Sequence, residues 1–335
     1  MSEKSGLDES LSARLRCPHC RSPLTLSASN LLCTLDSCAR QYPIVNGVPV
    51  LLNEDRSAFS IIDFIGHGDT TFRHQGALEQ LFARLIPEIT ANYAAPENYS
   101  RLRQELLALN PRPTVLVIGC GEVGKGMQEL VDDPVIQLVN TDVSYGTRTE
   151  IICDGHDLPF ADASFDGVII QAVLEHVADP PRCVDELQRV LVERGIVYAE
   201  TPFMQQVHGG PFDFTRYTCL GHRRLFRHFD EITSGATAGA ALALAWSYQY
   251  FLLSFVRHPR SRVLMKGFAR LTACWLRLID PWIVNTPGSL DASLGHFFLG
   301  RKNAFPLSER QIISLYRGAG NILPDPASQQ RGRDA

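Results

Sequence analysis

Four cysteines near the start of the chain have the spacing of a metal site. Cys17 and Cys20 form one close pair, and Cys33 and Cys38 form a second pair after a spacer of hairpin length. Two such pairs can supply four thiolates to one tetrahedral Zn²⁺ ion. A short segment with few apolar residues also needs a metal of this kind in order to fold. We therefore predict a structural zinc site in residues 1–55, with unrelated thiols as the alternative.

A glycine-rich turn follows a predicted buried strand. Residues 115–118 are apolar and mostly β-branched, as expected of a strand that is covered on both faces. Gly119 and Gly121 come next, and glycines let the backbone turn tightly while a ligand approaches it. The next predicted strand ends in Asp142, about twenty residues later, where a carboxylate can accept hydrogen bonds from a ribose diol. A nucleotide-like ligand is the prediction, and a simple turn-capping role for Asp142 is the alternative.

These residues need a sheet to position them. From residue 114 to about 234, short apolar strands alternate with amphipathic helices. That alternation is typical of a parallel, doubly wound α/β sheet, whose strands end at the edge where ligands bind. Ahead of the sheet we expect helices, because four apolar residues recur at helical spacing. They are Leu78, Leu81, Phe82 and Leu85.

The glycine turn opens a series of four blocks in order between residues 114 and 201. They read Val-Leu-Val-Ile-Gly-Cys-Gly, Asp-Gly-His-Asp-Leu-Pro-Phe, Ser-Phe-Asp-Gly-Val and Leu-Glu-His-Val. This series resembles the class I S-adenosylmethionine-dependent methyltransferases, although Val117 stands where many members have an acidic residue. A nicotinamide-binding dehydrogenase shares the glycine turn but has no place for the second and fourth blocks. The resemblance implies S-adenosylmethionine as the cofactor and a Rossmann-like sheet of seven strands, the last two near residues 231–233 and 295–299.

The same resemblance implies roles for individual residues around the cofactor. It places Gly119, Cys120 and Gly121 under the methionine moiety, Asp142 at the ribose, Asp154 and Gly155 at the adenine, and Gln171 and Ala172 beside the sulfonium. The alternative for Asp154, as for Asp142, is that it caps a turn.

The cysteine segment carries a second resemblance. From Cys38 the chain reads Cys-Ala-Arg-Gln-Tyr-Pro-Ile-Val-Asn-Gly-Val-Pro-Val-Leu-Leu. This series is similar to the zinc-ribbon activator subunit of tRNA and translation-factor methyltransferases. In that family the ribbon is structural and helps to hold a methyltransferase, so the resemblance implies no catalytic role for the cysteines.

The loop after the fifth predicted strand is the candidate acceptor side. We expect His208 or Asp213 to handle the acceptor's proton and Arg216 or Tyr217 to orient the acceptor. The alternative is a structural Asp213–Arg216 pair that fixes the loop. His176, in the fourth block, is either a further proton acceptor or a helix-start histidine that bonds to the backbone. Similar loops occur in methyltransferases encoded among surface-polysaccharide genes.

An apolar stretch interrupts the final part of the sheet. Residues 232–256 contain no charged side chain, and residues 263–284 combine Trp275 and Trp282 with basic residues. This composition is typical of an interfacial helix. We expect a lid or a membrane-facing platform for a lipid-linked acceptor. A dimer interface or an extra core layer is the alternative, and a spanning helix is less favoured because the stretch is rich in alanine and polar residues.

We therefore expect six segments. They are a zinc-ribbon-like domain at 1–55, a helical linker at 56–113, a cofactor-binding Rossmann-like domain at 114–234, an apolar helical insert at 235–290, a final strand and C-terminal helix at 291–320, and a disordered tail at 321–335.

The net charge and the first residues of the chain limit the functions that we expect. The net charge is −4 and the pI is about 6.2, which disfavours general attraction to nucleic acid. The first residues lack the apolar core of a secretion signal, so we expect a cytoplasmic protein, with peripheral contact at the inner membrane face. The predicted activity is methyl transfer to a small or lipid-linked acceptor, of a surface-polysaccharide or quinone type. An RNA methyltransferase with a zinc module and a non-catalytic cofactor-binding scaffold are the alternatives.

Overall fold

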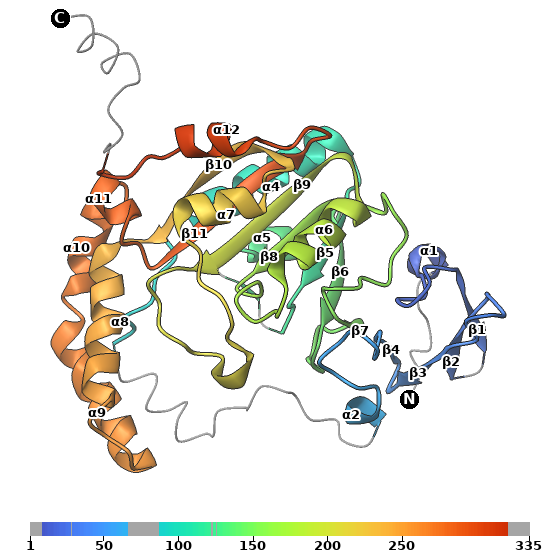
Figure 1. Ribbon diagram of the computed structural model, residues 1–335, viewed down its shortest axis with the longest axis horizontal. Helices are drawn as coiled ribbons and strands as arrows, with labels where there is room; N and C mark the ends of the chain where they lie inside the picture. Colours follow the sequence, from blue (N-terminus) through green and yellow to red (C-terminus); the bar gives the residue numbers. More distant parts are fainter. Residues whose placement is uncertain (1–8, 28, 66–86, 122, 125, 321–335) are drawn as a thin grey trace, which may run out of the picture.

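The computed structural model describes residues 9–27, 29–65, 87–121, 123–124 and 126–320, which form an α/β fold around one sheet (Figure 1). Every residue of β5 (Thr114–Ile118) is buried, and the strand pairs in parallel with β6 (Gln137–Asp142) and β8 (Phe165–Gln171). A continuous apolar strand of this kind suits the centre of a sheet with helices on both faces. The Rossmann-like α/β class expected from the sequence is confirmed. The expected linker helix around Leu78–Leu85 and the expected tail lie outside the described residues.

The sheet has eleven strands among the described residues, rather than seven. In spatial order they are β1 (Leu24–Ser27), β2 (Asn30–Cys33), β3 (Gln41–Val45), β4 (Val48–Leu51), β7 (Ile151–Cys153), β6, β5, β8, β9 (Leu191–Pro202), β11 (Gly295–Lys302) and β10 (Phe229–Ala238). The expected last two strands are β10 and β11, and β11 runs antiparallel to both of its neighbours. The additional strands, β1 to β4, come from the cysteine-bearing segment, a name that we use for residues 9–57.

Two helical layers cover the central strands. Val115 packs with the apolar face of α4 (Ala95–Leu109), whereas the next residue, Leu116, packs with α6 (Pro180–Val190) on the other side. Side chains alternate along a strand, so one strand serves both layers. α6 begins after Asp179, whose side chain accepts a hydrogen bond from the backbone of Arg182 in the first turn of the helix. Other helices are α1 (Glu9–Arg14), α2 (Ile62–Ile65), α5 (Gln128–Val131), α7 (Cys219–Leu225), α12 (Glu309–Ser314) and the short 3-10 helix η1 (Gly210–Phe212).

The cysteine-bearing segment continues the sheet instead of standing apart as a separate domain. β4 pairs in parallel with β7, with Val50 opposite Ile152. Buried Glu186 of α6 completes the junction. Its carboxylate accepts hydrogen bonds from Arg21 at 2.7 Å and from the backbone of Leu158 at 3.0 Å. The segment is therefore held by main-chain pairing and by an ion pair with a buried carboxylate.

The apolar insert is a helical unit between β10 and β11. It consists of α8 (Ala240–Leu253), α9 (Pro259–Ala273), α10 (Leu276–Ile283) and α11 (Pro287–Leu290). Buried Asp280 of α10 accepts hydrogen bonds from the backbone of Gly239 at 2.7 Å and of Leu242 at 3.1 Å, so α10 caps the start of α8. No described helix has the length and apolar character needed to cross a bilayer.

Replacement of Glu186 by Gln tests the junction. Arg21 and Arg189 both bond to this buried carboxylate, so Glu186→Gln should lower the free energy of unfolding by about 1–3 kcal/mol in urea denaturation at neutral pH. Burial opposes ionisation, but bonds from Arg189 and Arg21 outweigh it and lower the pKa of Glu186 in the folded chain. This stabilisation is present above the pKa of the unfolded group, about 4.3, and is lost as the pH falls through the lower folded value.

The difference in free energy of unfolding between the wild type and the Glu186→Gln variant should therefore become smaller at acidic pH. Glu193→Gln, at an exposed position of β9, is the control. Equal stabilities of the Glu186→Gln and Glu193→Gln variants at neutral pH would contradict the account of the junction.

Candidate functional site

The four cysteines converge on one point. Cys17 Sγ lies 3.8 Å from Cys38 Sγ, and Cys20 Sγ lies 3.4 Å from Cys33 Sγ. All four sulfur atoms lie within 4.8 Å of one another. Thiolates bonded to Zn²⁺ at about 2.3 Å in a tetrahedron are about 3.8 Å apart. The cluster is therefore compatible with a zinc ion held by these cysteines, and its position in the N-terminal hairpins suits a structural role.

The glycine turn and the end of β6 meet at the carboxyl edge of the sheet. The backbone of Gly121 donates to Asp142 Oδ2 at 3.0 Å. Gly119 has a φ of +76°, and a Cβ there would lie 2.3 Å from a Val173 methyl, so glycine is required at this position. The side chain of Cys120 is buried, which leaves only its backbone at the turn. The structure thus brings together the turn and the carboxylate that the sequence predicted as neighbours.

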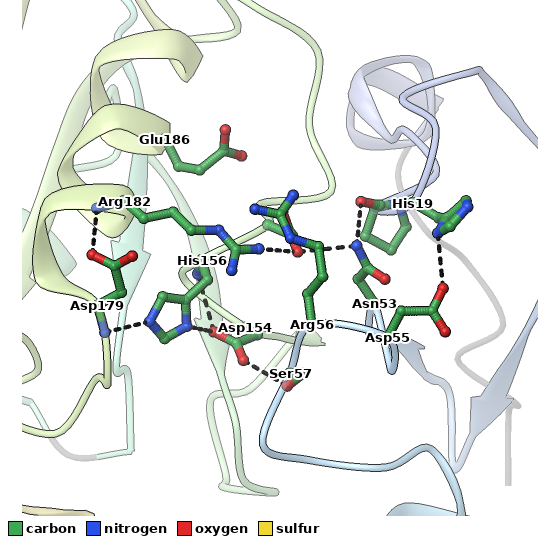
Figure 2. A network of polar contacts seen from close by, with 12 residues as sticks. His19, Asn53, Asp55, Arg56, Ser57, Asp154, His156, Asp179, Arg182 and Glu186 are labelled. Atoms are coloured by element: carbon green, nitrogen blue, oxygen red, sulfur yellow. Dashed lines mark hydrogen bonds and ion pairs between the residues drawn. The ribbon is translucent and has the colours of Figure 1, made fainter.

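Asp154, predicted at the adenine, already has partners within the chain (Figure 2). Ser57 Oγ donates to Asp154 Oδ2 at 2.6 Å, and His156 Nδ1 lies 2.6 Å from Oδ1. His156 Nε2 accepts from the backbone of Asp179 at 3.1 Å, so Nδ1 is the donor to Asp154. Burial opposes ionisation of Asp154, but the bonds from His156 and Ser57 outweigh it and lower the pKa of this carboxyl.

Ser57 was not predicted from the sequence, because no motif surrounds it. It comes from the segment after β4, far from Asp154 in the chain. Gly155 is buried, and a Cβ there would lie 2.9 Å from Cys183 Sγ. The cysteine-bearing segment therefore reaches the predicted adenine end of the groove.

Gln171 and Ala172, predicted beside the sulfonium, lie next to a buried carboxylate at the end of β9. Gln171 Nε2 donates to Glu200 Oε2 at 2.8 Å. Asn92 Nδ2 also donates to both oxygens of Glu200, at 2.9 and 2.8 Å. Burial raises the pKa of Glu200, although these donors oppose the shift. Ala172 has a φ of +54° and faces the same cavity as Glu200. The sequence analysis did not single out Glu200.

Asp213, which the sequence analysis proposed along with His208 to handle the acceptor's proton, is paired with Arg216. Arg216 Nη2 donates to Asp213 Oδ2 at 2.9 Å, and Nη1 contacts the other oxygen. The backbones of His208 and Gly209 also donate to Asp213, at 2.8 and 3.1 Å. The Asp213 side chain is 1% exposed. Burial opposes its ionisation, but the bonds from Arg216 and the loop hold its pKa well below the usual range. The structure favours the alternative in which Asp213 and Arg216 fix the loop.

Tyr217, the second residue predicted to orient an acceptor, is half-buried and packs near the His222 ring, at 6.5 Å between ring centroids.

Both candidate histidines lie close to Glu175. The sequence analysis included this residue in the fourth block but gave it no role. His176 Nε2 lies 3.8 Å and His208 Nε2 lies 3.7 Å from Glu175 Oε1. Glu175 is 1% exposed, and neither carboxylate oxygen has a hydrogen-bond partner among the described residues. Burial raises the pKa of Glu175 to about 8. The feature of the sequence that could have identified Glu175 is its position next to His176 in the fourth block.

A cavity of about 220 Å³ connects these groups with the cofactor edge. Its lining includes Ala172, Glu175, Glu200 and His208. The insert contacts the loop that carries His208, because Tyr250 Oη of α8 donates to the backbone oxygen of Val207 at 2.6 Å. The insert thus lies directly against the acceptor side of the site.

Comparisons with known proteins find similarity in the central segment. Residues 116–199 match a family model described as "Methyltransferase domain". The chain is 31% identical over 129 residues to "Probable tRNA methyltransferase 9B" of Bos taurus, with 35% of this chain covered. The match spans only 28% of that relative's length.

Two solved structures are similar. The first is phosphoethanolamine N-methyltransferase 2 of Haemonchus contortus with phosphomonomethylethanolamine and S-adenosylhomocysteine, at 13% identity over 63% of this chain and 54% of that chain, with a TM-score of 0.39. The second is the MccD protein, at 13% identity over 64% of this chain and 99% of that chain, with a TM-score of 0.42.

The family match supports methyl transfer with S-adenosylmethionine for residues 116–199. It begins after the cysteine-bearing segment, ends before the insert, and does not identify the acceptor.

Proposed function

We propose that the chain, which carries a methyltransferase domain at residues 116–199, transfers the methyl group of S-adenosylmethionine to a small or lipid-linked acceptor. The observation that carries the proposal is the contact between the glycine turn and Asp142 at the carboxyl edge of the sheet. Ligands of open α/β sheets bind at this edge. When bound, S-adenosylmethionine supplies a methyl group activated by a cationic sulfonium.

The residues at this edge suit the cofactor in both shape and charge. Gly119 and Gly121 leave the backbone accessible, and Asp142 would hold the ribose hydroxyls. Asp142 is buried, which raises its pKa, but backbone donors from Gly121 and Ser144 at 3.0 Å support the carboxylate. Glu200 and Glu175 line the adjoining cavity, so carboxyl groups surround the place where the sulfonium would lie. Proximity and alignment in such a site provide much of the rate of methyl transfer.

The cavity at Glu175 and His208 would receive the acceptor. Its volume of about 220 Å³ suits part of a molecule rather than a bulky polymer. Glu175 and His208 both line this space, with His208 Nε2 3.7 Å from Glu175 Oε1, so a polar atom of the acceptor would lie beside these two side chains. In this proposal Asp213 and Arg216 act by fixing the loop that carries His208.

The zinc ion that we propose at the four cysteines is structural. The cysteine-bearing segment also carries Ser57 to Asp154 (Figure 2). In addition, Asn53 Nδ2 donates to Asp157 Oδ2 at 3.0 Å. The stability of this segment would therefore affect the cofactor groove.

The outer face of the insert supports a lipid-linked acceptor. Its apolar side chains are widely exposed, with Trp282 at 84% and Leu278 at 74%. The others that are exposed are Leu244, Phe251, Phe255, Val263, Leu264, Phe268, Leu271 and Trp275. Exposed basic residues such as Arg257, Arg260 and Lys266 are interspersed with them along the sequence, as expected for contact with an anionic membrane surface. The insert forms the end of the molecule opposite the cysteine-bearing segment (Figure 1). We propose that these exposed side chains rest on a membrane while α8 contacts the loop that carries His208.

An RNA acceptor is the second candidate, because the bovine relative is named as a tRNA methyltransferase. RNA binding would weaken steeply and log-linearly with salt, whereas apolar insertion into a membrane would not follow that slope. A non-catalytic scaffold would bind S-adenosylmethionine without turnover of any acceptor.

The cofactor proposal is tested by removing the charge of Asp142. Asp142→Asn should weaken the binding of S-adenosylhomocysteine by about ten- to a hundredfold in calorimetry, because charged hydrogen bonds contribute about 1.5–3 kcal/mol. Asp185→Asn, at an exposed position of α6, should bind like the wild type. Equal affinities of the two variants would exclude Asp142 from the site.

The acceptor-side proposal is tested by truncating the exposed apolar face. The double variant Leu278→Ala/Trp282→Ala should bind vesicles of mixed neutral and anionic phospholipids at least about tenfold more weakly in sedimentation assays, because each side chain contributes about 1.5–3 kcal/mol when buried. Phe305→Ala removes a side chain that is 82% exposed outside the insert and should have no effect. Two results would overturn the membrane proposal. The first is wild-type protein that binds RNA but does not bind vesicles, and the second is a double variant that differs from the wild type only in its oligomeric state.

A further inference from the structure

Glu175, His176 and His208 form a second cluster of metal-binding side chains, separate from the cysteines. One ligand atom from each lies within 4.8 Å of the other two. The three residues come from two segments, the turn after β8 and the loop after β9. Two imidazoles and one carboxylate are a ligand set that divalent transition metals such as Fe²⁺ and Zn²⁺ use with positions left open for a substrate.

The two histidines are oriented as metal ligands usually are. His176 Nδ1 lies 2.6 Å from the backbone oxygen of Phe212, and His208 Nδ1 lies 3.2 Å from that of Gln206. A carbonyl oxygen can only accept, so each Nδ1 carries the hydrogen and each Nε2 presents its lone pair. A backbone carbonyl on the far nitrogen is a common way to fix a metal-binding imidazole. Both Nε2 atoms face Glu175 Oε1, at 3.8 and 3.7 Å.

Glu175 provides a second, independent observation. Its side chain is 1% exposed and lines the cavity, yet both oxygens lack a hydrogen-bond partner among the described residues. Buried carboxyl groups are almost always satisfied, because an unpaired one is costly. The nearby guanidinium of Arg216 is already used by Asp213 and by the backbone oxygens of Gln205 and Gln206. A cation between Glu175 and the two histidines would satisfy this carboxylate.

The distances permit such a cation. Nitrogen and oxygen ligands at about 2.0–2.2 Å from a tetrahedral metal are roughly 3.3–3.6 Å apart. The separations of 3.8 and 3.7 Å in the structure would close to this range with small side-chain rotations. Glu175 and His208 line the cavity, so the open coordination positions would face the acceptor.

We propose that Glu175, His176 and His208 bind one divalent transition-metal ion, whose open positions bind an oxygen atom of the acceptor. The binding of the metal stands on the geometry alone, whereas its role in holding the acceptor rests on the proposed methyltransferase function.

Cobalt titration of the full-length protein tests the site, after one equivalent of Zn²⁺ per chain has been added to fill the cysteines, whose thiolates select zinc. The wild type should bind about one Co²⁺ per chain with a weak visible spectrum that lacks sulfur-to-cobalt charge-transfer bands. Glu175→Gln, which keeps the size of the side chain, and His208→Ala should each lose at least about tenfold in cobalt affinity, since even an outer partner of a metal ligand contributes that much. His258→Gln, at an exposed position of the insert, should match the wild type.

Two further measurements distinguish loss of the metal site from misfolding and from failure of the proposed methyltransferase function. Circular dichroism and thermal melting without metal establish that each variant is folded, and Cys33→Ser should leave the weak cobalt spectrum in place. Calorimetry with S-adenosylhomocysteine on the same samples tests the proposed function independently. Wild-type binding of S-adenosylhomocysteine together with no cobalt binding, or cobalt binding that is unchanged in Glu175→Gln and His208→Ala, would overturn the metal site alone. Cobalt binding without any binding of S-adenosylhomocysteine would support the metal site and contradict the methyltransferase proposal.

Discussion

The parallel pairing of β5, β6 and β8 is the constraint on which the site depends. Parallel strands end at one edge, and here that edge gathers carboxyl groups that are largely removed from water. Asp142, Asp154 and Glu200 are each held by nearby donors, which come from the glycine turn, from His156 and Ser57, and from Asn92 and Gln171. Glu175 has no such donor among the described residues. The edge is therefore preorganised for positively charged ligands, with one acidic group left unsatisfied.

The two additions to the central fold act on opposite ends of this edge. The cysteine-bearing segment joins the sheet through β4 and brings Ser57 to Asp154. The insert leaves the sheet after β10 and places Tyr250 of α8 on the loop that carries His208. Each addition would therefore influence a different ligand, the first the cofactor and the second the acceptor. This arrangement explains how one fold can keep its cofactor site while its acceptor side changes.

Local pattern was enough to predict part of this site. The contact between Gly121 and Asp142 follows from a turn and an acidic strand end on neighbouring parallel strands, and the cysteine cluster follows from spacing. The role of Ser57 could not be predicted from the sequence, because its contact with Asp154 depends on the pairing of β4 with β7. Glu175 was overlooked for a related reason. Its significance comes from burial and from His208, which is distant in the chain and close only after folding.

A crystal structure with bound S-adenosylhomocysteine tests the central claim most directly. The account predicts that the ribose hydroxyls bond to Asp142 and that the sulfur faces the cavity between Ala172 and Glu175. A nucleoside bound elsewhere on the chain, or one at this edge that makes no contact with Asp142, would contradict the account.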